Sequence, residues 1–367
     1  MPKARSPRNP RNPQGNALTS GQLPRFFELY ALAGSLAVCA GVFALMGFNL
    51  VGWLVVSAIV YLIAVGVFSS IVESRRKATD RVVRGLVVVA FLLAFIPLVS
   101  TLATVIVRGI SSLTLNFVTQ AAGSHFDVAT LKVTNTEGAL QSIVGTLEIT
   151  GIAALMSIPI GLLTAIYLVE YAQPTQWMAR TVTFLVDVMT GIPSIVAGLF
   201  AFSLFSIIVG PSKVFSGFTA SVALSVLMIP IVVRSSEEML KLVSSELREA
   251  SYALGVTKFA TITRIVLPTA VAGLVTGIML AVARVIGETA PIFIAASFTN
   301  NLNFNAFSGP MSTLAVQAYA AYKFPGKDIQ ASIDSAWGAA LLLVLLVVIL
   351  NLIARLVARF FAPKGLR

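Results

Sequence analysis

The segment KLVSSELREASYALGVTKFATITRIVLP, residues 241–268, predicts a short amphipathic helix between two long apolar stretches. Within it, ELREASYALG places Leu247, Ala250 and Leu254 on one side of the expected helix. We expect Gly255 to end this helix in a left-handed turn, which other residues adopt only with strain. The segment therefore predicts a helix–turn–helix that lies parallel to a membrane and fits a groove on another protein.

The composition predicts that this segment belongs to a membrane protein. Hydrophobic residues make up 57% of the 367 residues and charged residues only 11%, whereas soluble domains carry about 25% charged residues. The apolar runs are continuous over about 20 residues or more, which is typical of spanning helices rather than the short alternating strands of a β-barrel. The net charge of +11 does not indicate a nucleic-acid partner, because the basic residues lie between apolar runs. Cys39 is expected to be a small core residue.

We expect an all-α membrane protein with about eight transmembrane helices. The predicted spans are roughly 27–47, 50–72, 83–110, 139–171, 179–210, 217–240, 265–297 and 332–361. The expected kink points are Pro97, Pro159, Pro193 and Pro230. The expected domains are a disordered basic tail over 1–24, two extra N-terminal helices over 25–78, and the main transmembrane domain over 79–362.

Lysine and arginine gather in alternate loops of this arrangement. They are frequent in the N-terminal tail, in the loop ESRRKATDRVVR (73–84), in the segment 241–264 and at the C-terminus. An even number of spans puts all four on one side, so both termini are expected to be cytoplasmic. The long outward loops 111–138 and 298–331 are interpreted either as ordinary loops or as a landing surface for an external partner.

The segment 241–268 resembles the EAA loop of ABC-importer permeases. That pattern is Glu-Ala-Ala, three residues, Gly, nine residues and then Ile-x-Leu-Pro, and the matching residues are Glu249, Ala250, Ser251, Gly255, Ile265, Leu267 and Pro268. Only Ser251 departs from the pattern, as a small polar residue in place of alanine. The resemblance implies a six-helix ABC type I importer permease core whose loop docks on cytoplasmic ATPase subunits. An interfacial helix without a partner is the alternative interpretation.

Three further stretches resemble the phosphate-specific ABC importer permeases. They are SIPIGLLTAIYLVEYA (157–172), TGIPSIVAGLF (190–200) and ARVIGETAP (283–291). These permeases come as two related subunits, PstA and PstC, and the GETAP ending is similar to the PstA branch. The resemblance covers roughly 83–361, and the first two helices have no counterpart in it. It implies a multi-pass protein of a bacterial or archaeal cell membrane that forms half of a pathway for phosphate.

Arg284 and Glu288 stand inside the seventh predicted span. A bare arginine in the middle of a bilayer costs about 2.5–3.5 kcal/mol or more, so it normally faces a polar path or a partner. A continuous helix would put the two residues on one face, one turn apart. With the family resemblance, we expect Arg284 to contact phosphate transiently and Glu288 to be its counter-ion; a structural ion pair is the alternative. Glu148 and Asp187 are candidates for the same pathway or for tying helices together.

The sequence has no Gly-x-x-x-x-Gly-Lys-Ser/Thr phosphate loop, so we expect no ATP hydrolysis and no cofactor or metal in this chain. The resemblance implies an assembly with a PstC-like permease, two ATPase subunits that use ATP and Mg, and an external phosphate-binding protein, all in or beside membrane lipid. Other interpretations are a permease for another oxyanion such as sulfate or molybdate, a secondary anion transporter, and a membrane-embedded enzyme. A secondary transporter needs no coupling loop, and we find no cluster of metal ligands or of nucleophile and base.

Overall fold

The computed structural model describes residues 23–24, 26–127, 132–173 and 175–361. The expected tail over 1–24 lies almost wholly outside these residues. The chain forms two compact units, Met1–Leu102 and Ala103–Arg367. Seven of the described helices are long and apolar enough to cross a membrane, or up to eight if one bent pair is a single span, which agrees with the predicted number. The cytoplasmic position of the termini and the domain limit at 78–79 stay predictions.

The first unit is built from α1 (Phe27–Met46), α2 (Leu50–Val72) and the first part of α3 (Arg75–Ser112). Asn49 begins α2, since its side-chain oxygen accepts hydrogen bonds from the backbone N–H groups of Val51 and Gly52. The helix α1 buries Ser35 and Cys39, so the cysteine is the core residue that the sequence predicted. The helix α3 begins eight residues before the predicted span at 83, because the arginines and lysine that precede the apolar run are themselves good helix formers.

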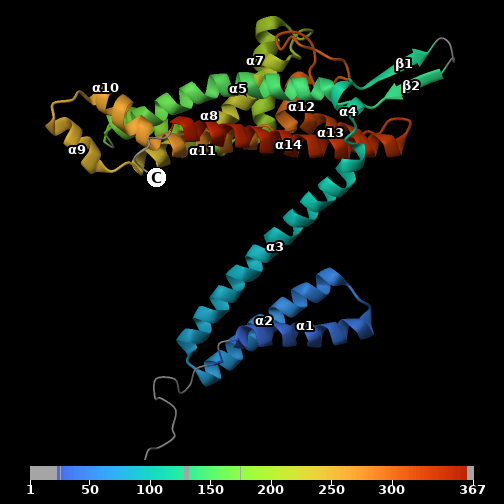
Figure 1. Cartoon of the computed structure of the whole chain (residues 1–367), viewed down its shortest axis with the longest axis vertical. Helices are drawn as coiled ribbons and strands as arrows, with labels where there is room; N and C mark the ends of the chain where they lie inside the picture. The colour runs from blue at the N-terminus through green and yellow to red at the C-terminus, as the bar shows by residue number, and fades with distance from the viewer. Residues whose placement is uncertain (1–22, 25, 128–131, 174, 362–367) are drawn as a thin grey trace, which may run out of the picture. The chain divides into compact units, whose positions relative to one another are not determined.

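The second unit contains the rest of α3 and a helical bundle (Figure 1). Its further elements are α4 (Leu115–Thr119), β1 (Gly123–Asp127), β2 (Lys132–Thr136), α5 (Leu140–Ile166), the π-helical turn η1 (Tyr167–Tyr171), α6 (Trp177–Thr190), α7 (Ser194–Val209), α8 (Gly217–Lys241), α9 (Ser245–Ala253), α10 (Lys258–Thr261), the π-helical turn η2 (Ile262–Val266), α11 (Leu267–Val285), α12 (Ala290–Ala296), α13 (Leu314–Lys323) and α14 (Ile329–Phe361). The helices α9 and α10 lie at the end of this bundle where α14 finishes, and the β1–β2 hairpin lies at the opposite end (Figure 1).

The hairpin lies in the segment 111–138, an expected outward loop for which the sequence predicted no strands. Its strands pair antiparallel, with Gly123 opposite Thr136 and Asp127 opposite Lys132. The second strand reads KVTNT, and its β-branched residues favour an extended chain. This small sheet is an addition to an otherwise helical fold.

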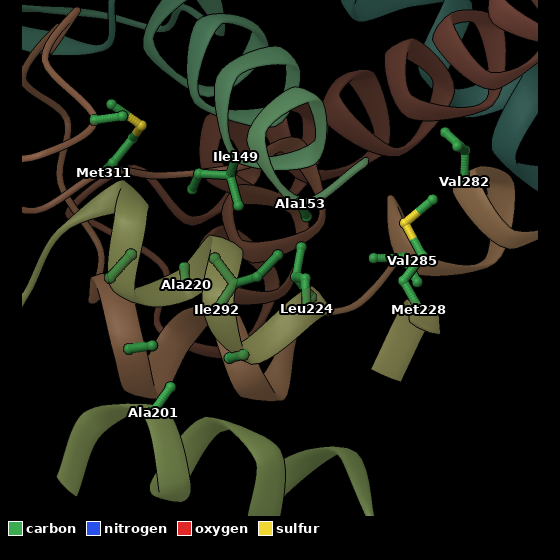
Figure 2. Close-up of a cluster of buried hydrophobic side chains, with 14 of the residues drawn as sticks. Ile149, Ala153, Ala201, Ala220, Leu224, Met228, Val282, Val285, Ile292 and Met311 are labelled. Atoms are coloured by element: carbon green, nitrogen blue, oxygen red, sulfur yellow. The ribbon is translucent and has the colours of Figure 1, made fainter. Parts of the chain in front are cut away.

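The core of the second unit is centred on α8. Leu224 and Met228 of this helix are fully buried, in one cluster with Ile149 and Ala153 of α5 and with Val285 of α11 (Figure 2). Because an apolar environment surrounds the outside of a membrane protein as well, close approach through small residues contributes much of the packing. Alanines accordingly make up a large share of this cluster.

A sharp bend separates α6 from α7. The two helices are long and apolar enough to form one span only together, and the chain bends by 106° between them. The bend falls at the Gly-Ile-Pro of residues 191–193, and Pro193 is the residue before the first turn of α7. The predicted kink at Pro193 is therefore confirmed and is a full break in the fifth predicted span, whereas the kinks at three prolines inside continuous helices stay predictions: Pro97, Pro159 and Pro230.

The predicted continuous helix over 265–297 is wrong. The helix α11 ends at Val285, and α12 begins only at Ala290. Pro291 in a continuous helix would lack the N–H that bonds to the carbonyl of Gly287, and its ring would clash with that carbonyl. The glycine adds freedom at the same place, so the chain breaks between Ile286 and Thr289 and restarts with the proline in the first turn of α12, where a missing N–H costs nothing.

The predicted outward loop 298–331 is only partly a surface loop. Met311, Ser312 and Leu314 are buried, and the helix α13 lies within the segment. The backbone here approaches α5 so closely that a Cβ on Gly145 would lie 2.1 Å from the carbonyl oxygen of Ser312. Residues 311–317 are therefore part of the core of the bundle, whereas residues 300–302 and 322–330 are exposed, and the landing surface stays a prediction.

Candidate functional site

The helix α9 and the turn after it have the predicted geometry. Ser244 begins the helix, with its hydroxyl accepting a hydrogen bond from the backbone N–H of Glu246. Gly255 follows the helix with a φ of +77°. The N–H of Gly255 donates to the carbonyl of Tyr252 at 2.9 Å, and the next N–H donates to the carbonyl of Ser251 at 3.2 Å. The left-handed turn expected from the sequence is therefore confirmed.

The motif residues divide into an exposed group and a packed group. Glu249 and Ala250 are exposed, while Ser251 is buried and its hydroxyl lies 2.8 Å from that of Thr261 in α10. The serine that departs from the EAA pattern thus fastens α9 to α10. The remaining motif residues, Ile265, Leu267 and Pro268, lie at the junction of η2 with α11.

Large apolar side chains are exposed around this loop. The exposed fraction is 83% for Leu254 and 71% for Phe259, and Leu242 and Leu247 are exposed as well. A contiguous exposed patch of apolar side chains is typical of a surface that a partner or a membrane covers. The loop thus presents an exposed apolar surface together with the exposed side chain of Glu249.

Sequence reasoning missed the residues that hold the loop on the bundle. Arg248 of α9 forms an ion pair with Glu170 of η1, with 2.8 Å between Nη2 and Oε1, and both side chains are largely buried. Lys258 of α10 lies over the ring of Tyr171, 5.0 Å from its centroid. The only hint in the sequence was a glutamate near the end of a long apolar run, since nothing linked it to an arginine 78 positions away.

Arg284 lies in the last turn of α11, at the break before α12. Its neighbours Val282 and Val285 are buried in the cluster that contains Met228, near the middle of α8 (Figure 2). The arginine itself is exposed, and Glu288, in the break, is half-buried. Within the described part of the chain these two residues form no ion pair with each other, because the helix that would have put them on one face has ended.

The other two candidate acids differ in their surroundings. Asp187 of α6 forms an ion pair with Arg234 of α8, which also pairs with Glu237 at 2.8 Å. This agrees with the helix-tying alternative for Asp187. Glu148 of α5 is half-buried, and its Oε2 is buried without a hydrogen-bond partner in the described residues. Such an oxygen needs a partner from outside this chain or a proton.

The chain matches a known family of transport proteins. The model of the family "Binding-protein-dependent transport system inner membrane component" matches residues 157–365. The chain is 43% identical over 270 residues to "Phosphate transport system permease protein PstA 1" of Mycobacterium tuberculosis (strain CDC 1551 / Oshkosh), covering 74% of this chain and 85% of that protein. It is 35% identical over 268 residues to PstA of Haemophilus influenzae, covering 73% and 89%.

A solved structure shows a similar fold. It is an inward-facing form of the MetNI methionine ABC transporter, with a TM-score of 0.50 and 24% identity, and the match covers 61% of this chain and 96% of that chain.

Among the described residues no group of three or more His, Cys, Asp or Glu side chains is placed to hold a metal ion.

Proposed function

This chain belongs to the family of binding-protein-dependent transport system inner membrane components, and within it to the PstA phosphate permeases, and from this premise we propose how it moves phosphate. It is a multi-pass permease subunit of an ABC importer in the bacterial inner membrane. A PstC-like permease completes the pathway, two ATPase subunits hydrolyse ATP with Mg, and an external phosphate-binding protein delivers the substrate. These partners are part of the proposal, which rests on the relatives.

The proposed pathway rests on one observation, which is that the side chain of Arg284 is exposed. The described residues of this chain leave Arg284 exposed, yet its neighbours Val282 and Val285 are buried near the middle of α8. If Arg284 met lipid, it would cost about 2.5–3.5 kcal/mol on insertion scales, and other estimates are higher. A second permease and an aqueous path between the two subunits remove this cost. We therefore place the phosphate path beside Arg284.

A guanidinium suits phosphate because it stays charged and offers forked N–H donors to the oxygens. An arginine without a nearby acid would hold the anion too tightly for transport. Glu288 lies in the break directly after the arginine's helix, so it remains our candidate counter-ion, reaching Arg284 only if the break rearranges. Glu148, with its unpartnered oxygen, is a further pathway candidate, and Asp187 is assigned to helix tying.

Coupling is proposed to run through α9 and α10. Their exposed apolar side chains and Glu249 would fit a groove on an ATPase subunit, and ATP-driven closure of the two ATPase subunits would move the loop. A secondary transporter has no use for such a surface.

Phosphate uptake tests the function directly. Cells that express the complete importer should accumulate radiolabelled phosphate, and an excess of unlabelled phosphate should suppress the signal while an equal excess of sulfate or molybdate should not. Equal competition by sulfate would instead support a permease for oxyanions in general. Recovery of the permease without any ATPase subunit after mild solubilisation would contradict the ABC assembly.

A further inference from the structure

The coupling loop consists of α9, α10 and the turn between them. It touches three membrane helices, but the chain connects it to only two of them. The helix α9 follows α8 after a short link, and α10 continues through η2 into α11. The helix α5 has no such connection to the loop. It nevertheless carries Ile149 and Ala153 into the central cluster, and Glu148 beside them. Movement of the loop therefore needs a non-covalent route to reach α5.

Besides the packing of α5 on α8 in the central cluster, two consecutive residues of the turn η1 at the end of α5 contact the loop directly. Glu170 holds α9, because its Oε1 accepts hydrogen bonds from Nη2 of Arg248 at 2.8 Å and from Nε at 3.1 Å. Tyr171 holds α10, because the ammonium of Lys258 lies over its ring. The two helices of the coupling loop, α9 and α10, are thus attached to one short segment.

The ion pair between Glu170 and Arg248 is buried, and the guanidinium makes further hydrogen bonds. The side chain of Glu170 is only 4% exposed, and that of Arg248 is 17% exposed. The other donors of Arg248 bond to the carbonyl oxygens of Val243 at 2.6 Å and Leu240 at 3.0 Å, at the end of α8. One guanidinium therefore connects α9, the end of α8 and the end of α5. Removing one partner of a buried ion pair is costly, because the other charge is left without compensation.

The segment that carries Glu170 and Tyr171 is a π-helical turn. The N–H of Ala172 bonds to the carbonyl of Tyr167 at 2.8 Å, five residues back. Such turns insert an extra residue into a helix and are frequent at functional sites. Here the wider turn ends α5 with two successive side chains that reach different helices of the loop.

We propose that Glu170 and Tyr171 are positioning residues for coupling, and that they transmit movement of the docked loop from α9 and α10 to α5. The inference rests on the proposed function, since it requires an ATPase that moves the loop. The inference adds the two residues through which α5 would move together with α8 and α11 when the loop moves.

The test is the amount of phosphate imported per ATP hydrolysed by the complete importer in proteoliposomes. In Glu170→Gln the ATPase subunits should remain bound and hydrolyse ATP, while this ratio falls about tenfold, a typical size for coupling between sites. The effects of Glu170→Gln and Arg248→Gln should be less than additive in the double variant, because both changes remove the same ion pair, while Arg248→Gln also loses the bonds to the carbonyls of Val243 and Leu240. Glu238→Gln is the matched control, because Glu238 is an exposed acid near the end of α8, outside α9 and α10, and its replacement should leave the ratio unchanged.

A second pair of variants tests the contact between Tyr171 and Lys258 of α10 without disturbing a buried charge. Tyr171→Leu removes the aromatic face and should lower the ratio, while Tyr171→Phe keeps that face and should retain it. An unchanged ratio in both Glu170→Gln and Tyr171→Leu, with a parent that transports, would overturn the inference. So would loss of ATPase subunits with a normal ratio in the complexes that remain, since that is a purely structural role. A parent that imports no phosphate on ATP addition would contradict the proposed function instead.

Discussion

At the scale of the residue, Glu73 shows how a charge is accommodated at the end of a membrane helix. Its side chain is 2% exposed and pairs with Arg81 at 3.0 Å. It also accepts hydrogen bonds from the N–H of Leu23 and the hydroxyl of Ser69, both at 3.0 Å. Burial alone raises the pKa of this carboxyl, but the two hydrogen bonds and the charge of Arg81 together bring it below its ordinary value of 4.5.

This lowered pKa makes the stability of the first unit depend on pH. The stabilisation is fully present above pH 4.5 and is lost as the pH falls through the lower pKa of the folded state. Glu73→Gln should therefore destabilise the unit by about 1–3 kcal/mol at neutral pH, and the difference from the parent should vanish in acid.

Cys39 supplies the measurement, because it is the only cysteine of the chain and is buried in α1. A pyridyl disulfide, which reacts with thiols in acid as well, reports its exposure as temperature rises. Glu28→Gln is the control, since this more exposed acid is a second partner of Arg81, and its effect should be smaller. A difference between Glu73→Gln and the parent that grows in acid would contradict the assignment.

At the scale of the element, the turn after α9 was predicted from its sequence, whereas the break after α11 was not. A short amphipathic helix followed by a glycine is a local signal, and local hydrogen bonds decide its geometry. The break depends on Gly287 and Pro291 acting together, while Pro159 and Pro230 interrupt nothing. The Arg248–Glu170 pair could not be predicted from the sequence either, because two residues far apart in sequence meet only once the bundle has packed.

Gly255 offers a clean test of the turn. A Cβ at this position would meet no atom within 4 Å, so the cost of substitution comes from the positive φ alone. Gly255→Val should strain the turn by about 1–3 kcal/mol, misplace Glu249, lower phosphate uptake and weaken retention of the ATPase subunits in detergent. The permease should still be found in the membrane in near-normal amount.

Gly255→Asn is the matched control, because asparagine tolerates the left-handed conformation far better than a β-branched residue. It should retain most of the uptake. If valine and asparagine behave alike, with uptake as in the parent, the turn is not needed for coupling.

At the scale of the whole molecule, the hydropathy of the sequence predicted the number of spans, and the EAA pattern predicted the helix–turn–helix between two of them. Both predictions depend on features that persist over 20 residues or more. The exposed side chain of Arg284 could not be predicted in the same way, because the sequence suggested a helical pair with Glu288 that the break removes. The structure thus shows an exposed arginine at the end of α11, next to buried residues of the central cluster, and we propose that a second subunit covers it.

Phosphate uptake by Arg284→Gln in the complete importer is the most direct test of this account. Arg355→Gln is the control, an exposed arginine near the end of α14, away from the break. We expect Arg284→Gln to insert, to assemble with its partners and to lose nearly all uptake, and Arg355→Gln to transport like the parent. Arg284→Lys should retain only part of the uptake, because it keeps the charge and loses the forked donors. Normal uptake by Arg284→Gln, or loss of assembly in place of loss of transport, would contradict the account.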